Sequence, residues 1–112
     1  MDIEMLREYC LSLPGTEEEI KWEENLCFMI EKKIFLIYSL THSGLALKCN
    51  REEFEELAAR DGIHQAWHFA KGQWIGVDSL EVMPVSELKK RIAESREMVL
   101  RKLTKKLQEK YK

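Results

Sequence analysis

The sequence predicts an α+β fold: an antiparallel sheet with two hairpins, packed against an N-terminal, a middle and a long C-terminal helix. Three observations lead to this prediction. Apolar residues recur at helical spacing near both ends of the chain and once in the middle. Several short segments between residues 19 and 78 alternate apolar and polar side chains or are continuously apolar, as strands do. Turn-forming residues separate these segments, which favours antiparallel pairing of neighbours.

The first helix is expected over residues 2–12. Ile3 and Leu6 begin its apolar stripe, and Asp2 suits the N-cap position because its carboxylate can accept a backbone N–H. A Pro-Gly pair follows the helix closely. Proline cannot continue a helix and glycine favours a turn, so the helix is expected to end there.

Three strands are expected next, over residues 19–24, 26–31 and 33–40. In the first, Ile20 and Trp22 alternate with charged residues, so both are expected to face the core. The third contains the run IFLIYSL, which is apolar on both faces and typical of a central strand. The turn between the second and third strands lacks the Asn-Gly pair of a tight hairpin.

A further strand is expected over residues 45–49, where alternation places Cys49 on the same face as two leucines. A buried thiol of this kind stays protonated and unreactive. Asn50 then stands at capping-box spacing from Glu53, which predicts a helix over residues 51–60.

The second hairpin is expected over residues 65–70 and 74–78, around a turn at Lys71-Gly72. Pro84 and Ser86 then open the longest predicted helix, which runs to Leu107. The expected order of elements is α-β-β-β-β-α-β-β-α.

The chain of 112 residues is expected to be a single domain over residues 1–112. Its 45% hydrophobic and 34% charged residues are typical of a globular protein. Charges among the first residues argue against a signal peptide, and no apolar run could span a bilayer, so a cytoplasmic location without membrane contact is expected. Three cysteines without a C-x-x-C pair predict neither a disulfide framework nor a zinc site.

Several segments, in order, resemble the MmcQ/YjbR family. They are MDIEMLREYCLSLPGTEEE, FMIEKKIFLIYSL, LALKCNREEFEELAAR, HFAKGQWIGV and LKKRIAESREMVLRKLTKKL. The fourth is similar to a His-x-x-Lys-x-x-Trp-x-x-Val pattern through His68, Lys71, Trp74 and Val77, although Gln73 stands where histidine is common. The resemblance implies a double-wing fold, related to frataxin-like and secretion-chaperone-like folds, and a DNA-binding role.

Charge is unevenly spread along the chain. Residues 1–60 hold 13 acidic and 7 basic side chains, a net charge of −6, and residues 61–112 hold 7 and 11, a net charge of +4. With the resemblance, the lysines at both predicted hairpin tips favour a non-enzymatic protein that contacts the DNA backbone with low sequence specificity. The candidate DNA-binding residues are Lys32, Lys33, Lys48, Arg51, Lys71, Arg101, Lys102, Lys105 and Lys106. Charged turn tips can equally serve solubility.

Two other functions are compatible with the sequence. The first is a protein-interaction or chaperone-like adaptor that binds a protein partner and no nucleic acid. The second is a ligand-binding or enzymatic domain with a pocket near His68, Trp67 and Trp74, although Trp74 also suits the core. No catalytic residue, metal site or cofactor is predicted, because glycines are scattered and His64 and His68 lack nearby ligands at metal spacing. A structural hydrogen bond is expected for His68.

Overall fold

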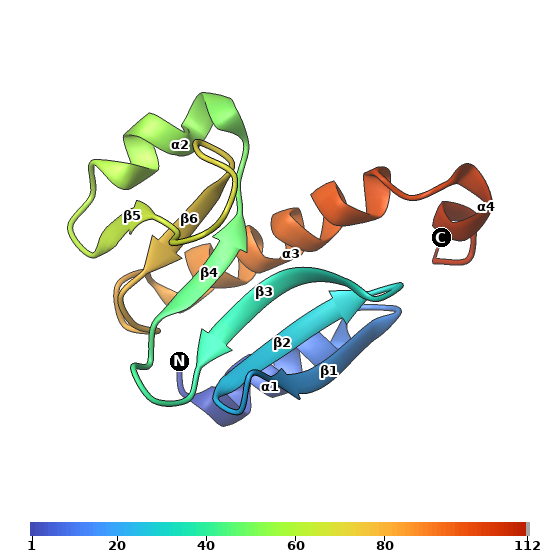
Figure 1. Cartoon of the computed structure of the whole chain (residues 1–112), viewed down its shortest axis with the longest axis horizontal. Helices are drawn as coiled ribbons and strands as arrows, with labels where there is room; N and C mark the ends of the chain where they lie inside the picture. The colour runs from blue at the N-terminus through green and yellow to red at the C-terminus, as the bar shows by residue number, and fades with distance from the viewer. Residues whose placement is uncertain (112) are drawn as a thin grey trace.

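The computed structural model describes residues 1–111, which form four helices and six strands (Figure 1). All six strands belong to one antiparallel sheet with the order β1-β2-β3-β4-β6-β5, so the predicted α+β class is confirmed. The elements are α1 (Ile3–Ser12), β1 (Thr16–Lys21), β2 (Asn25–Ile30), β3 (Lys33–Ser39), β4 (Leu45–Lys48), α2 (Arg51–Ala58), β5 (Ile63–Gln65), β6 (Trp74–Val77), α3 (Val85–Arg101) and α4 (Lys105–Glu109).

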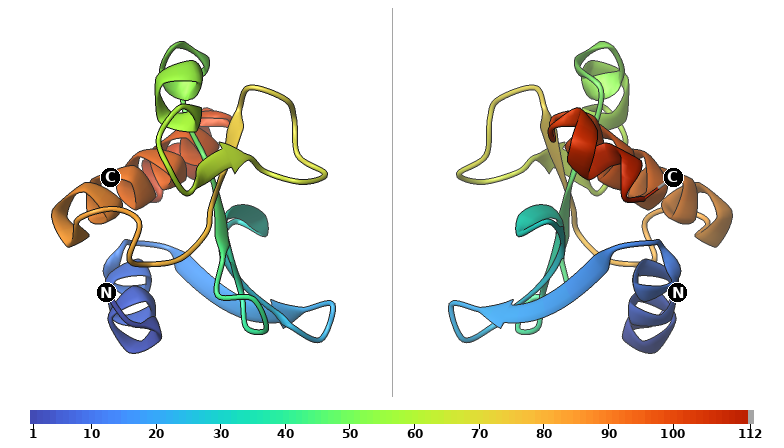
Figure 2. Two further views of the ribbon diagram at one scale, coloured as in Figure 1. Left: turned by 90° about the vertical axis from the view of Figure 1, so that its left-hand side faces the viewer. Right: turned by 90° about the vertical axis from the view of Figure 1, so that its right-hand side faces the viewer.

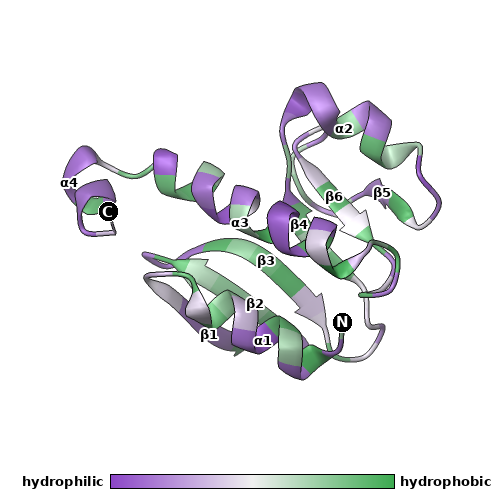
Figure 3. Cartoon of the chain, turned by 180° about the vertical axis from the view of Figure 1, so that it is seen from behind, coloured by the Kyte–Doolittle hydropathy of each residue, from purple (hydrophilic) through white to green (hydrophobic). Residues whose placement is uncertain are grey.

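Helices α1, α2 and α3 lie on one side of the sheet, and the other side carries only loops (Figure 2). The core fills the space between the helices and the strands, where Leu6, Phe28, Phe35, Leu88 and Ile92 are fully buried. The hydropathy colouring shows apolar residues facing the sheet along α3 (Figure 3). One face of the sheet is therefore left without a helical cover.

The first strand begins earlier than the alternation predicts. β1 pairs with β2 from Thr16 opposite Ile30 to Lys21 opposite Asn25, so Trp22 falls into the turn with φ 51°. Ile20 and Trp22 are 58% and 67% exposed, and the prediction that they face the core is wrong. The reason is position, because β1 is an edge strand with no strand beyond it.

The second hairpin is shorter than predicted, since β5 ends at Gln65 and residues 66–73 form a loop. The Gln65 side chain organises this loop. Its Oε1 accepts from the Gly72 amide at 2.9 Å, and its Nε2 donates to the carbonyls of Ala66 at 2.7 Å and Phe69 at 3.3 Å. The side chain thus satisfies backbone groups that strand pairing would otherwise satisfy.

The long C-terminal helix ends at Arg101, and a second, short helix follows it. Thr104 is the N-cap of α4, and its hydroxyl accepts from the Leu107 amide at 3.3 Å. Gln108 donates to the carbonyls of Arg101 and Leu103 at 3.2 and 2.8 Å. These side chains satisfy the backbone groups between α3 and α4. The prediction of one helix to Leu107 is therefore wrong at its end, because the apolar stripe continues across two separate helices.

The sheet opens between β3 and β4, and Ser95 of α3 spans the opening. The two strands pair only from Leu36 opposite Leu47 to Tyr38 opposite Leu45. Beyond that point, the Ser95 hydroxyl accepts from the Lys48 amide at 2.9 Å and donates to the Phe35 carbonyl at 2.6 Å. One buried hydroxyl therefore bridges the two strands beyond the last residue pair of their ladder.

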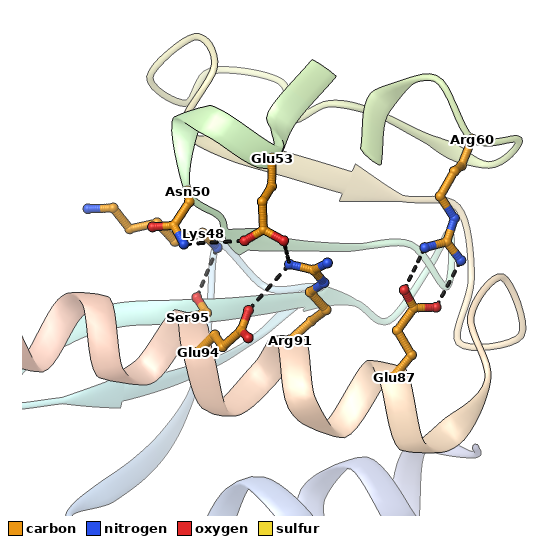
Figure 4. A network of polar contacts seen from close by, with 8 residues as sticks. All are labelled: Lys48, Asn50, Glu53, Arg60, Glu87, Arg91, Glu94 and Ser95. Carbon is orange, nitrogen blue, oxygen red and sulfur yellow. Dashed lines mark hydrogen bonds and ion pairs between the residues drawn. The ribbon is translucent and has the colours of Figure 1, made fainter. Parts of the chain in front are cut away.

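Ion pairs hold α2 against α3 (Figure 4). Arg60 donates to both carboxylate oxygens of Glu87 at 2.6 and 2.9 Å, and Arg91 donates to Glu53 at 2.8 Å. These guanidinium hydrogen bonds lower the pKa of Glu87 and the pKa of Glu53. The bidentate geometry fixes the spacing of the two helices.

The turn between β2 and β3 is a tight two-residue turn without glycine. Ile30 pairs with Lys33, and the two residues between them adopt left-handed φ values, 49° at Glu31 and 64° at Lys32. This is the backbone that favours Asn-Gly.

Replacing Lys32 by glycine is expected to stabilise the chain by about 1 kcal/mol. The left-handed conformation costs a side-chain-bearing residue roughly 1–2 kcal/mol, and the larger conformational entropy of glycine in the unfolded chain cancels part of this gain. Urea unfolding measures the change. Lys32→Ala is the matched control, since it also removes the exposed pair with Glu17 but keeps Cβ. Equal stabilities of the glycine and alanine variants would contradict the argument.

Candidate functional site

The strand directions bring the predicted hairpin tips to one end of the sheet. β3 and β6 are both antiparallel to β4, so the first residues of β3 and β6 lie where β4 ends. Lys33 and Lys48 occupy this end, and the loop that leads into β6 carries Lys71. We call this region, with the adjoining ends of α2, α3 and α4, the basic end.

The last turn of α3 adds cations to the basic end. The side chain of Lys102 is a neighbour of Lys48, and burial together with this second ammonium lowers the pKa of Lys48 to about 8. Two neighbouring ammonium groups repel each other, and an anion that binds between them relieves this repulsion. This pair is therefore the part of the basic end best suited to receive a phosphate.

Some of the predicted cations are already paired. Lys32 contacts Glu17 at 3.1 Å and Arg101 contacts Glu97 at 3.6 Å. Within residues 1–111, no ion pair is found for the remaining candidates, Lys33, Lys48, Arg51, Lys71, Lys102, Lys105 and Lys106. Exposed pairs are weak, so the paired lysine and arginine also remain available to a strong anion.

Lys110 and Tyr111, which follow α4, hold this helix at the basic end. Lys110 contacts the Glu31 carboxylate at 3.1 Å, and the Tyr111 hydroxyl donates to the same carboxylate. The Tyr111 ring lies against Gly15, where an added Cβ would come within 2.2 Å of it. These contacts place the end of α4 beside the turn between β2 and β3.

A second candidate site is a cavity of about 760 Å³ on the face of the sheet that no helix covers. Its floor includes Ile37, Ala46 and Gly76, which are cross-strand neighbours on β3, β4 and β6. The small side chain of Ala46 leaves space above this part of the sheet, whereas Gly76, which has no side chain, leaves room for the His64 ring. We call this cavity the open groove.

Two exposed tryptophans stand at the rim of the open groove. Trp22 comes from the turn between β1 and β2 and is 67% exposed, and Trp67 comes from the loop before β6 and is 78% exposed. Trp22 and His68 both have left-handed φ values, 51° and 66°. Bulky residues rarely adopt this conformation, and such strain gathers at functional sites.

His64 forms one wall of the open groove. Its Nε2 lies 3.0 Å from Asp78 Oδ1 and its Nδ1 lies 2.9 Å from the Gln65 carbonyl, so both ring nitrogens are held. The ring covers Gly76, where an added Cβ would approach its Cε1 to 2.5 Å. From the sequence, His64 is recognisable only as a possible metal ligand. The signal for its position in the groove is the glycine that lies opposite it in the paired strands, Gly76.

The sequence of the chain matches the model of a known protein family. A model of the YjbR family matches residues 11–98, which is most of the chain. The chain belongs to the YjbR family. The resemblance found in the sequence is therefore confirmed.

Two solved structures have the fold of this YjbR-family chain. One is protein DR2400 of Deinococcus radiodurans, which has a DUF419 domain. It superimposes on this chain with a TM-score of 0.89 and is 24% identical, and the match covers 97% of this chain and 86% of that one. The other, from Pseudomonas syringae, has a TM-score of 0.73 and 19% identity and covers 88% of this chain and 98% of that one. At these identities the likeness shows the fold alone. No curated protein matches the chain.

In this YjbR-family chain, Trp67 and His68 of the predicted pocket line the open groove, whereas Trp74 does not. The Phe69 ring stacks on Trp74 with 4.4 Å between centroids and 27° between planes, which covers the indole. His68 is exposed, and its side chain makes no hydrogen bond within residues 1–111. The structural hydrogen bonds expected of His68 belong to His64 instead.

The cysteines of the YjbR-family chain are buried and free. Burial raises the pKa of Cys10 to about 12 and also raises the pKa values of Cys27 and Cys49. The burial predicted for Cys49 is confirmed. Protonated thiols of this kind are poor nucleophiles.

Within residues 1–111, no cluster of three or more His, Cys, Asp or Glu side chains is placed so that it could hold a metal ion. No helix in this range is both long and apolar enough to cross a membrane.

Proposed function

We propose that this YjbR-family chain is a non-enzymatic DNA-binding protein that contacts the phosphate backbone through its basic end, with little sequence specificity. The observation that carries the proposal is the common placement of cations from distant stretches of the chain. Lys33, Lys48, Lys71 and Lys102 come from four different elements or loops and lie at one end of the sheet. Backbone contacts by lysine and arginine supply most of the affinity of non-specific binding.

The mode of contact differs from simple insertion of two lysine-tipped hairpins. The first tip is braced by α4 through Glu31, and Lys32 pairs with Glu17. The proposed contact surface is therefore the end of the sheet with the neighbouring helix ends, and the Lys48–Lys102 pair stands within it. A duplex lying across this end would take up phosphates between the two ammonium groups.

The net charge of −2 limits the strength of this interaction and makes it sensitive to salt. The acidic parts of the molecule repel DNA, so only the basic end contributes attraction. If about six phosphates are neutralised, a fourfold rise in salt lowers the affinity roughly a thousandfold. Micromolar binding is therefore expected only at low salt.

Fluorescence anisotropy with a labelled duplex at low salt tests the proposal. Charge reversal at both hairpin tips, in Lys33→Glu/Lys71→Glu, is expected to weaken binding about a hundredfold and to flatten the salt dependence, since two phosphate contacts are lost. Both side chains are outside the core, so folding should be retained.

The matched control is Lys21→Glu/Lys89→Glu, which makes the same change in net charge away from the basic end. Lys21 ends β1 at the opposite end of the sheet, and the Lys89 ammonium lies over the Tyr9 ring of α1. The control is expected to lose affinity only severalfold. Equal losses in the two variants, or no binding of the unmodified chain at micromolar concentration, would reject DNA binding through this surface.

A further inference from the structure

The open groove adjoins the basic end, because the loop that carries Lys71 also carries Trp67, but its described lining contains no lysine or arginine. It lies on the same sheet face as Trp74, but the stacked Phe69 ring covers that indole and closes the groove on this side. Loops close it elsewhere: the turn with Trp22, the loop with Trp67 and the connection between β3 and β4 with His42. A cavity of about 760 Å³ bounded by loops has the size of sites for small molecules, which span roughly 300–1,000 Å³.

The residues that line the open groove favour a ligand with a flat, apolar ring. Ile37 and Ala46 supply aliphatic surface, and the two rim tryptophans present their indoles to solvent from different loops. Exposed indole rings gain by stacking on another aromatic ring. An aliphatic ligand would fill the same space but gain none of this stacking.

The polar groups of the groove favour a ligand that accepts hydrogen bonds. The lining contains Asn25 and the imidazoles of His42 and His68, and neither imidazole is hydrogen-bonded within residues 1–111. Asp78 is the one carboxylate among the described lining residues, and it is already bonded to His64. A carboxylate on the ligand would therefore meet hydrogen-bond donors, and it would meet no carboxylate among the described lining residues that is without a partner.

We propose that the open groove binds a small planar aromatic carboxylate, whose ring stacks on Trp67 and whose carboxylate lies toward His42, His68 and Asn25. Two bulky residues hold left-handed backbone conformations at this rim, Trp22 and His68. The strain places aromatic and imidazole side chains around the cavity. The site is independent of the basic end, so it stands or falls separately from DNA binding.

Titration with 2-naphthoate, monitored by tryptophan fluorescence and by protein amide NMR shifts, tests the proposal. Saturable binding is expected with a dissociation constant on the order of 0.1–1 mM for a probe of this size. Cyclohexanecarboxylate, which has the charge without the ring, and 2-naphthylmethanol, which has the ring without the charge, are each expected to bind at least tenfold more weakly.

Variants locate the binding. Trp67→Ala is expected to weaken 2-naphthoate binding at least tenfold without affecting folding, because Trp67 is 78% exposed. Ala46→Leu fills the floor and is expected to abolish binding. The matched control is Leu11→Ala, an exposed apolar residue on α1, which should leave binding unchanged.

Three results would overturn the assignment. One is the absence of saturable 2-naphthoate binding at several millimolar. Another is binding that persists unchanged in Trp67→Ala. The third is quenching of the tryptophans by oligothymidylate but not by 2-naphthoate, which would make the groove a base-stacking surface for nucleic acid.

Discussion

Replacing Ser95 by alanine is expected to destabilise the chain by about 3 kcal/mol. Its hydroxyl is fully buried and bridges the Lys48 amide and the Phe35 carbonyl at the point where β3 and β4 separate. Alanine leaves both backbone groups without a partner in a region where water cannot reach them. Each unsatisfied buried group costs roughly 1–3 kcal/mol.

Urea or thermal unfolding followed by circular dichroism measures this loss. Ser86→Ala is the matched control, because Ser86 is exposed in the first turn of the same helix and its replacement is expected to change stability by less than about 0.5 kcal/mol. A loss below about 1 kcal/mol in Ser95→Ala would show that the two strands pair directly, without help from the hydroxyl.

Arg96→Ala is expected to cost about 3 kcal/mol as well, for a different reason. The Arg96 side chain is only 8% exposed, and its Nε donates at 3.1 Å to the carbonyl of Pro14, which also accepts from Nη2. The substitution removes the packing of a long aliphatic stem and leaves the carbonyl unpaired. The turn between α1 and β1 would lose its attachment to α3.

Two variants separate these contributions. Arg96→Met keeps much of the packing and is expected to cost about half as much as alanine. Arg101→Ala is the exposed control on the same helix, where only a surface pair with Glu97 is lost, and its effect is expected to stay below about 0.5 kcal/mol. Similar losses in Arg96→Ala and Arg101→Ala would contradict a structural role for the buried guanidinium.

The hydrophobic periodicity of the sequence was sufficient to predict most of the helices and strands that pack on the core. The apolar spacing in α1 and the apolar runs of β2 and β3 predict these elements to within a few residues, because burial and periodicity act within each segment. The spacing in α3 predicts where this helix begins but not that it ends at Arg101. Predictions failed where a side chain from elsewhere satisfies the backbone. Gln65 builds the loop before β6 and Thr104 starts α4, and neither role follows from hydrophobic spacing.

Each candidate site was also only partly predictable from the sequence. The lysines of the basic end were recognisable as turn and helix-end cations, but their common location depends on β4 lying between β3 and β6. The open groove depends on cross-strand neighbours, since Ala46 and Gly76 become one floor only through pairing. Trp67 and His68 were associated with a pocket from their neighbourhood in the chain, whereas His64 and Trp22 were not.

By itself, the sequence determined the α+β class, the YjbR family and the positions of most helices and strands, because hydrophobic period and local turn chemistry are written into neighbouring residues. Only the tertiary structure decided which face of the sheet stays open, which cations share an end and which imidazole is held by a carboxylate. These properties depend on strand order and on contacts between residues far apart in the chain, such as Lys48 with Lys102 and His64 with Asp78.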